Sequence, residues 1–125
     1  KALILGTGGA SKAIAYALRK LKIEYDFVSR TADEFQYKYE ELDASIFEEY
    51  TIIINTTPVG THPNMDDYPN LDYSLFTKKH IAYDLIYNPE ETAFLKKAKA
   101  QGAVTKNGYE MLVLQAEKAW KIWNE

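Results

Sequence analysis

The sequence predicts an α/β fold built on a doubly wound, mostly parallel sheet with helices on both faces. Three observations support this prediction. A short apolar run, Leu3–Leu5, stops at a glycine cluster and gives way at once to a helical pattern. Further apolar runs of strand length follow at 25–28, 51–55 and 80–84, and helix-like segments lie between most of them. Strands that alternate with helices form parallel sheets, because a parallel pair of strands needs a long crossover connection.

The glycine cluster Gly6-Thr-Gly-Gly-Ala-Ser joins the first predicted strand to the first predicted helix. Gly6 permits the tight turn, and Gly8 lets the backbone approach a pyrophosphate. The small residues Ala10, Ser11 and Ala13 allow the helix to pack closely on the strand. A strand, a glycine turn and an amphipathic helix in this order are typical of dinucleotide-binding, Rossmann-like domains.

The start of the first helix is the predicted phosphate site. Its free N–H groups and the positive end of its dipole favour an anion around Gly9–Lys12, where the Lys12 ammonium adds charge. The alternative is a glycine-rich turn that binds nothing. We predict that the turn holds the pyrophosphate of a dinucleotide through Gly6, Thr7, Gly8, Gly9 and Ala10.

Ser29, Arg30 and Thr31 follow the second predicted strand. In domains that bind NAD, an Asp or Glu about 20 residues beyond the glycines holds the ribose 2′-hydroxyl, whereas an Arg accommodates the 2′-phosphate of NADP. Arg30 occupies this place, and Glu24 and Asp26 come too early in the strand. We therefore predict NADP as the cofactor, with Ser29 and Thr31 as auxiliary donors. The alternative is that Arg30 is a solvated loop cation.

The stretch Phe35–Glu40 alternates apolar and polar residues with period two, which indicates a half-exposed strand. Only about six residues separate it from the previous strand, and a parallel crossover needs a dozen or more. We therefore expect an irregular or antiparallel edge strand, and a fold that is shortened after the second strand.

Thr51–Asn55 is the clearest buried strand, and Thr56-Thr-Pro-Val-Gly60 follows it. Hydroxyl side chains beside Pro and Gly put hydrogen-bonding groups at the carboxyl edge of the sheet, where open α/β sheets bind ligands. We therefore predict that Thr57 contacts the cofactor. The alternative is an ordinary turn.

The remaining elements are predicted from caps and periodicity. They are a short helix over Leu42–Glu49 with Asp43 or Ser45 as cap, a helical turn over Leu71–Phe76, a strand over His80–Asp84, a helix over Glu90–Gln101 closed by Gly102, a strand near Ala103–Lys106, and a last helix from about Tyr109 to Trp123. Apolar residues recur along one face of that last helix, so we expect it to pack on the core.

The composition of the chain limits the classes of partner that it can bind. The chain has 125 residues, a net charge of −3 and no cysteine. No basic block or stripe is present to neutralise a phosphate backbone, so we expect no nucleic-acid partner. The apolar runs fall far short of the roughly 20 residues that cross a bilayer, so we expect no membrane partner. The lack of cysteine fits a cytoplasmic location. His62, Asp66 and Asp67 lack the spacing of metal ligands, and we predict no metal site.

The chain begins at Lys1, one residue before its first predicted strand and without an initiator Met. Termini normally carry a few loose residues. We therefore expect residues 1–125 to be a single cofactor-binding domain taken from a longer, two-domain protein.

Five motifs together resemble the C-terminal NADP-binding domain of the shikimate dehydrogenase family, over nearly the whole chain. They are Gly6-Thr-Gly-Gly-Ala-Ser, Ser29-Arg-Thr, Asn55-Thr-Thr-Pro-Val-Gly60, Tyr83-Asp-Leu-Ile-Tyr-Asn-Pro89 and Lys106-Asn-Gly-Tyr-Glu-Met-Leu-Val-Leu-Gln-Ala116. The resemblance implies an oxidoreductase that reduces 3-dehydroshikimate to shikimate with NADPH in aromatic amino acid biosynthesis. Two positions depart from the family pattern: Ser29 replaces the usual Asn, and Glu34 stands where a second basic residue is common.

The resemblance also implies roles for four residues near the chemistry. Leu85 and Gly108 would lie beside the nicotinamide, and Tyr87 and Gln115 would reach the substrate. Without the motifs, Tyr87 and Gln115 would be interpreted as a packed aromatic residue and a buried helical amide. The family's catalytic Lys and Asp belong to an N-terminal substrate domain, so no catalytic residue is assigned here. The full-length protein could form a homodimer.

Two other functions compete with this one. A relative that acts on quinate or an aminated analogue of shikimate would have a similar cofactor domain, because most substrate contacts lie elsewhere. A non-catalytic module that senses NADP would keep the same fold for regulation. A Lys and an Asp in the N-terminal domain would favour catalysis.

The Arg30→Ala variant should bind NADP about 10- to 150-fold more weakly and bind NAD unchanged, because a charge-assisted hydrogen bond to the 2′-phosphate contributes about 1.5–3 kcal/mol. Titration of the variant with both cofactors measures this. An equal loss for NADP and NAD would contradict the assignment of Arg30 to the 2′-phosphate.

Overall fold

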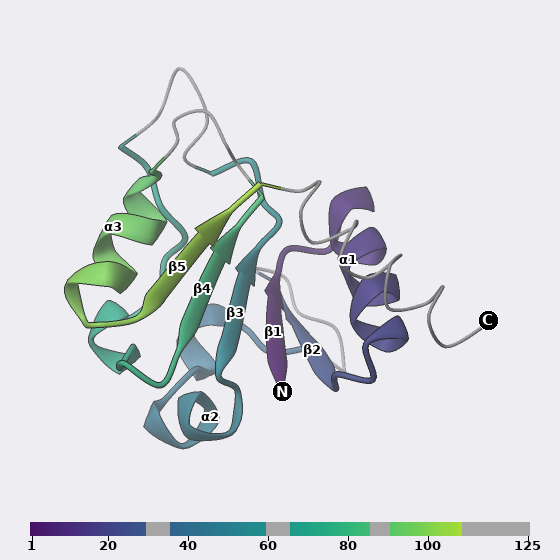
Figure 1. Cartoon of the computed structure of the whole chain (residues 1–125), viewed down its shortest axis with the longest axis horizontal. Helices are drawn as coiled ribbons and strands as arrows, with labels where there is room; N and C mark the ends of the chain where they lie inside the picture. Colours follow the sequence, from purple (N-terminus) through teal and green to yellow (C-terminus); the bar gives the residue numbers. More distant parts are fainter. Residues whose placement is uncertain (30–35, 60–65, 86–90, 109–125) are drawn as a thin grey trace.

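The computed structural model describes residues 1–29, 36–59, 66–85 and 91–108 of the chain (Figure 1). The strands are β1 (Ala2–Leu5), β2 (Tyr25–Val28), β3 (Ile52–Asn55), β4 (Ile81–Asp84) and β5 (Val104–Asn107). The helices are α1 (Gly9–Lys20), α2 (Ala44–Glu49) and α3 (Ala93–Ala100), with short 3-10 turns at Tyr39–Glu41 and Tyr73–Leu75. The predicted last helix, Tyr109–Trp123, lies outside the described residues. None of the described helices is long and apolar enough to cross a membrane.

All five strands are parallel, in the order β2-β1-β3-β4-β5. The chain winds from β1 to β2 on one side of β1 and then crosses to β3 on its other side. This reversal is the switch point of a doubly wound sheet, and ligands of such sheets bind outside the carboxyl ends of the strands beside it. The predicted fold class is confirmed.

The stretch after β2 forms one parallel bridge in place of a full strand. Tyr37 N–H donates to the Phe27 carbonyl and Ser29 N–H to the Tyr37 carbonyl, both at 3.0 Å, and Val28 is the bridge partner of Tyr37. The expected irregular edge is therefore confirmed, and the antiparallel option was wrong. A short connection suffices, because the pairing is confined to the carboxyl end of β2 and the chain does not have to return along the whole strand.

Alternate residues of β1, β2, β3 and β4 belong to two separate cores. Leu3 and Leu5 of β1 join a cluster with Phe47 of α2 and Phe94 of α3, whereas Ile4 joins a cluster with α1 on the other face. Figure 1 shows α1 on one side of the sheet and α3 on the other. Strands buried on both faces form continuous apolar runs, which is why the sequence displays them so clearly.

Two of the described helix ends follow the predicted signals, whereas α3 begins at Ala93 and not at the predicted Glu90. The Asp43 carboxylate caps α2 by accepting from the Ile46 N–H at 2.9 Å, so Asp43 is the cap and Ser45 is not. The Thr92 hydroxyl caps α3 by accepting from the Leu95 N–H at 3.3 Å. Gly102, with φ of +95°, terminates α3 as predicted.

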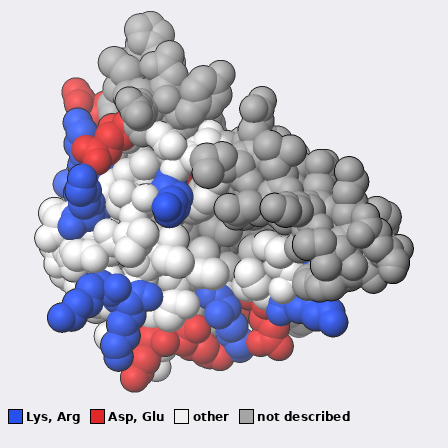
Figure 2. Space-filling view, viewed as in Figure 1, with Lys and Arg blue, Asp and Glu red and all other residues white. Residues whose placement is uncertain are grey.

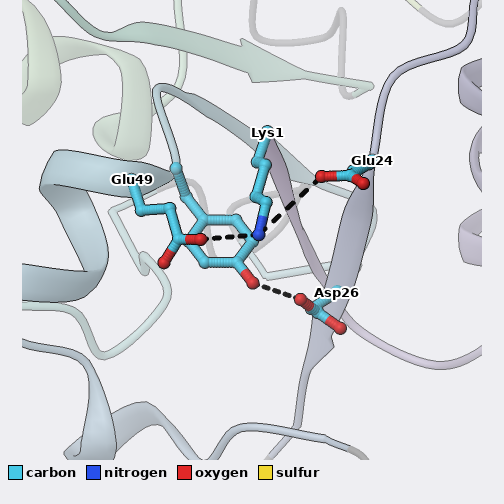
Figure 3. Close-up of polar contacts among 5 residues, drawn as sticks. Lys1, Glu24, Asp26 and Glu49 are labelled. Carbon is cyan, nitrogen blue, oxygen red and sulfur yellow. Dashed lines mark hydrogen bonds and ion pairs between the residues drawn. The ribbon is translucent and has the colours of Figure 1, made fainter.

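A cluster of charged and aromatic side chains ties the amino edge of the sheet together. Lys1 Nζ lies between two carboxylates, 2.5 Å from Glu49 and 3.8 Å from Glu24 (Figure 3). The hydrogen bond to Glu49 raises the pKa of Lys1. Beneath it, the buried Tyr50 hydroxyl donates to the Asp26 carboxylate of β2. Burial and this hydrogen bond raise the pKa of Tyr50 well above its usual value.

The Tyr50→Phe variant should lose about 1.5–3 kcal/mol of the free energy of unfolding, the usual net value of a hydrogen bond to a charged group. Because the fold raises the pKa of Tyr50, its contribution holds below the ordinary pKa of 10.0 and declines as the pH rises above it. Urea denaturation at pH 7 and above pH 10 measures both effects. Tyr16→Phe is the matched control, since the Tyr16 side chain is 56% exposed. Equal effects of the two substitutions would contradict the role of the hydroxyl.

Candidate cofactor-binding site

The register of the sheet brings five strand ends level at one edge. In order across the sheet, the final strand residues are Val28, Leu5, Asn55, Asp84 and Asn107. The described site residues predicted from the sequence begin at that edge or just beyond it, namely Gly6 after β1, Ser29 after β2, Thr57 after β3, Leu85 after β4 and Gly108 after β5. The structure therefore places them along a single edge, the upper edge of the sheet in Figure 1.

Gly6 makes the turn between β1 and the helix that follows. Its φ of +109° is a conformation that residues with side chains rarely adopt. A Cβ atom at this position would lie 2.9 Å from Thr56 Oγ1 and 3.1 Å from Thr57 Cγ2. Thr56 in turn donates to the Leu5 carbonyl through both its N–H, at 3.0 Å, and its hydroxyl, at 2.6 Å. The absent side chain thus lets the loops after β1 and β3 pack against each other.

Helix α1 begins at two glycines, Gly8 and Gly9, that are exposed in the described part of the chain. Gly8 is the N-cap residue and provides no side chain to cap the helix. Among the described residues, a Cβ atom on Gly8 or Gly9 would have no atom within 4 Å apart from its chain neighbours and, for Gly9, the backbone of its own helix. The first N–H groups of a helix have no partner within the helix, and the first turn of α1 holds no acidic residue. These features fit an anion such as a pyrophosphate.

The small residues of the turn do not all pack as predicted. Ser11 is buried, and its hydroxyl donates to the Gly8 carbonyl at 2.6 Å. Ala10 is exposed, so its predicted packing on the strand was wrong, and Ala15 lies on the buried side of α1 instead. Ala10 points away from the sheet because a helix turns 100° per residue. The contact of Ala10 with a cofactor stays a prediction.

Sequence reasoning missed a buried polar network behind Thr57. Asn55 Oδ1 accepts from the Thr57 N–H at 3.1 Å and from the Thr57 hydroxyl at 2.7 Å. Asn55 Nδ2 donates to both oxygens of Asp84, and the Thr92 hydroxyl donates to Asp84 Oδ2 at 2.7 Å. The available signal was that two apolar strands, Ile-Ile-Ile-Asn and Ile-Ala-Tyr-Asp, each end on a polar residue.

Leu85 and Gly108 lie at neighbouring strand ends. The Gly108 N–H donates to the Asp84 carbonyl at 3.0 Å, and the Tyr83 hydroxyl donates to the Gly108 carbonyl at 2.7 Å. The Leu85 N–H donates to the Asn55 carbonyl at 3.2 Å. The other predicted site residues, Arg30, Thr31, Tyr87 and Gln115, lie outside the described residues, as does His62.

Two hollows differ in their surroundings. A cleft of about 510 Å³ borders the predicted site and is lined by Thr57, Val59, Tyr39, Glu40 and residues 67–70. A hollow of about 570 Å³ lies at the opposite, amino edge, between Arg19, Lys22 and residues 23–26. Figure 2 shows acidic and basic side chains gathered along that lower edge. Because open α/β sheets bind ligands at the carboxyl edge, the cleft beside Thr57 is the better candidate.

The five-stranded parallel sheet and its switch point are those of the Rossmann-like class of domains, in which dinucleotides bind at this edge. No family model matches the chain. A shikimate dehydrogenase (NADP(+)) of Pelagibacter ubique is 39% identical over 132 residues, which cover 100% of this chain and 49% of that protein. Solved shikimate dehydrogenases from Aquifex aeolicus and from Thermus thermophilus, the latter in complex with NADP(H) and shikimate, are each 35% identical, with TM-scores of 0.72 and 0.71. Both alignments cover 98% of this chain and 47% or 48% of the other.

The chain spans about half the length of the curated relatives it matches. Over that half it is a relative of the shikimate dehydrogenases, and the resemblance carried by the five motifs is confirmed.

The Gly6→Ala variant should lose about 1–3 kcal/mol of the free energy of unfolding, because its Cβ meets Thr56 Oγ1 and its φ is strained. Gly9→Ala is the matched control, since no described residue lies within 4 Å of the place of its Cβ atom and alanine favours a helix. Urea denaturation of both variants measures the difference. A loss in Gly9→Ala as large as that in Gly6→Ala would contradict the close approach of the two loops.

Proposed function

We propose that the chain is the NADP-binding domain of a shikimate dehydrogenase, which reduces 3-dehydroshikimate to shikimate with NADPH. The single observation that carries the proposal is the open, uncapped start of α1 at the switch point of the sheet. Relatives named shikimate dehydrogenase (NADP(+)) over the whole chain support the choice of reaction.

Each part of the edge would serve one part of the dinucleotide. The pyrophosphate would lie over Gly8 and Gly9, where free N–H groups and the helix dipole stabilise its charge. Ser29, Arg30 and Thr31 would hold the adenosine 2′-phosphate, with Arg30 as the main cation. The nicotinamide would extend toward the ends of β4 and β5, beside Leu85 and Gly108. NADPH supplies the hydride when it is bound.

Most of the residues that bind the substrate and transfer its proton would lie in the rest of the protein. Tyr87 and Gln115 would contact shikimate from this domain, because a hydroxyl and an amide can pair with a polyol without adding charge. The hydroxyl proton requires a general acid–base, which we assign to the N-terminal substrate domain. We place the whole protein in the cytoplasm as a two-domain enzyme, with a homodimer as its candidate assembly.

The chain alone should bind NADP⁺ but oxidise no shikimate, whereas the full-length protein should do both. Hydride transfer needs the reacting carbon held beside the nicotinamide, and we assign the groups that hold it there mainly to the N-terminal domain. Absorbance at the NADPH band measures turnover with shikimate, quinate and aminoshikimate, and calorimetric titration measures binding. Gly8→Val is the control, since its side chain would occupy the place of the pyrophosphate.

Three outcomes would count against this proposal. Turnover by the chain alone would show that our assignment of the catalytic groups to the N-terminal domain is wrong. Preference for quinate or aminoshikimate would identify a relative with another substrate. Binding without any turnover in the full-length protein would identify an NADP-sensing module.

A further inference from the structure

A chain of buried hydrogen bonds runs from the start of α3 to the loop after β3, and the Asp84 carboxylate is its centre. The Thr92 hydroxyl donates to Asp84 Oδ2 at 2.7 Å, and Asn55 Nδ2 lies 3.3 Å from both carboxylate oxygens. Asn55 and Asp84 are 0% exposed. A carboxylate at this depth persists only where donors surround it, so these contacts are a requirement of the fold.

The carboxylate determines which way the Asn55 amide points. A carboxylate only accepts hydrogen bonds, so the amide turns its Nδ2 toward Asp84 and its Oδ1 toward the loop. Oδ1 there accepts from the Thr57 N–H and from the Thr57 hydroxyl. A backbone N–H only donates, so the contacts at both ends of the amide require the same orientation.

The proton of the Thr57 hydroxyl is therefore used inside the protein. Thr57 Oγ1 donates it to Asn55 and accepts from the Val59 N–H at 3.3 Å. A hydroxyl has one proton and two lone pairs, so Thr57 Oγ1 can offer a ligand a lone pair only. Thr57 also lines the cleft described above, and its methyl group lies 3.1 Å from the place of a Cβ atom on Gly6.

We infer that Asp84 is a positioning residue that acts through Asn55 to make Thr57 a hydrogen-bond acceptor. Given the proposed binding of NADP, Thr57 meets a ribose hydroxyl or an amino group of the dinucleotide, and not a phosphate oxygen. The buried carboxylate thereby selects which part of the cofactor can lie over the end of β3.

Exchanging the two side chains tests the Asp84–Asn55 pair. Asn55→Asp alone places two carboxylates in contact. Asp84→Asn alone turns an NH₂ group toward Thr92 or Asn55, and both of these side chains donate to Asp84 in the original chain. Each single variant should weaken NADP⁺ binding by the chain about tenfold or more. In the double variant the new carboxylate at position 55 accepts from Thr57 and from the new amide at position 84. Binding should then return to within about threefold of the original chain.

His80→Gln separates positioning from general stability. His80 is buried at the other end of β4, where its Nε2 lies 2.7 Å from the Phe47 carbonyl. His80→Gln should lower the melting temperature about as much as the single variants at positions 55 and 84 do. Its NADP⁺ affinity should nevertheless stay within about twofold of that of the original chain. A double variant that regains its melting temperature but not its affinity would overturn the inference, as would single variants that bind like the original chain.

Hydrogen exchange of the Thr57 and Val59 amides reports on the network without any ligand. Protection of both amides should fall in the single variants and recover in the double variant. Unchanged protection would overturn the positioning role even if NADP⁺ binds. If the original chain binds no NADP⁺, the proposed function fails, and the exchange data still decide whether Asp84 orders the Thr57 loop.

Thr57→Val tests the acceptor role directly. The variant should bind NADP⁺ about three- to tenfold more weakly and should bind inorganic pyrophosphate unchanged, since the proposed pyrophosphate site lies over Gly8 and Gly9 and does not use the Thr57 lone pair. Thr57→Ser is the matched control and should bind both probes as the original chain does. A parallel loss for pyrophosphate in Thr57→Val would show that the hydroxyl donates to phosphate.

Discussion

The shared register of five short parallel strands is the constraint on which the other features depend. Each strand has four residues, and the last residue of β1 is level with the last residues of both β2 and β3. A slip of one residue would turn every side chain of a strand to the opposite face. It would also take Gly6 away from Thr56 and Thr57, whose contacts leave no room for a side chain. The two-core packing and the edge that carries the candidate site therefore both depend on this register.

The two edges of the sheet divide their tasks. At the amino edge, charges are matched by contacts within the protein, such as those of Lys1 with Glu24 and Glu49. At the carboxyl edge, the residues from Thr7 to Ala10 are exposed and the helix start has no side-chain cap. Capping by a Ser, Thr, Asp or Asn side chain would stabilise α1, but it would also compete with a ligand for the same N–H groups. The turn keeps them available.

Much of the fold could be predicted from the sequence because its signals are local. Buried parallel strands are continuous apolar runs, Asp43 is a local cap, and Gly6 and Gly102 have the positive φ that their places require. The single bridge at Tyr37 was only partly foreseen, because the length of a connection does not say how much of a strand is paired. The Asn55–Asp84–Thr92 network could not be found this way, because it joins residues whose proximity depends on strand order. A sequence pattern gives the position of a polar residue and not its partner.

The structure shows where the acidic residues in and just before β2 lie relative to the carboxyl end of that strand. A carboxylate that reaches the ribose of NAD must lie beyond the carboxyl end of this strand. Glu24 precedes β2 and faces Lys1, and Asp26 accepts the Tyr50 hydroxyl, so both acids are committed at the amino edge. Their negative charge, together with that of Glu49, lies at the opposite end of the sheet from the proposed phosphate sites, where it repels an anion least. These contacts therefore hold three acidic side chains at the amino edge, whereas Glu40 and Asp67 line the cleft beside Thr57 at the carboxyl edge.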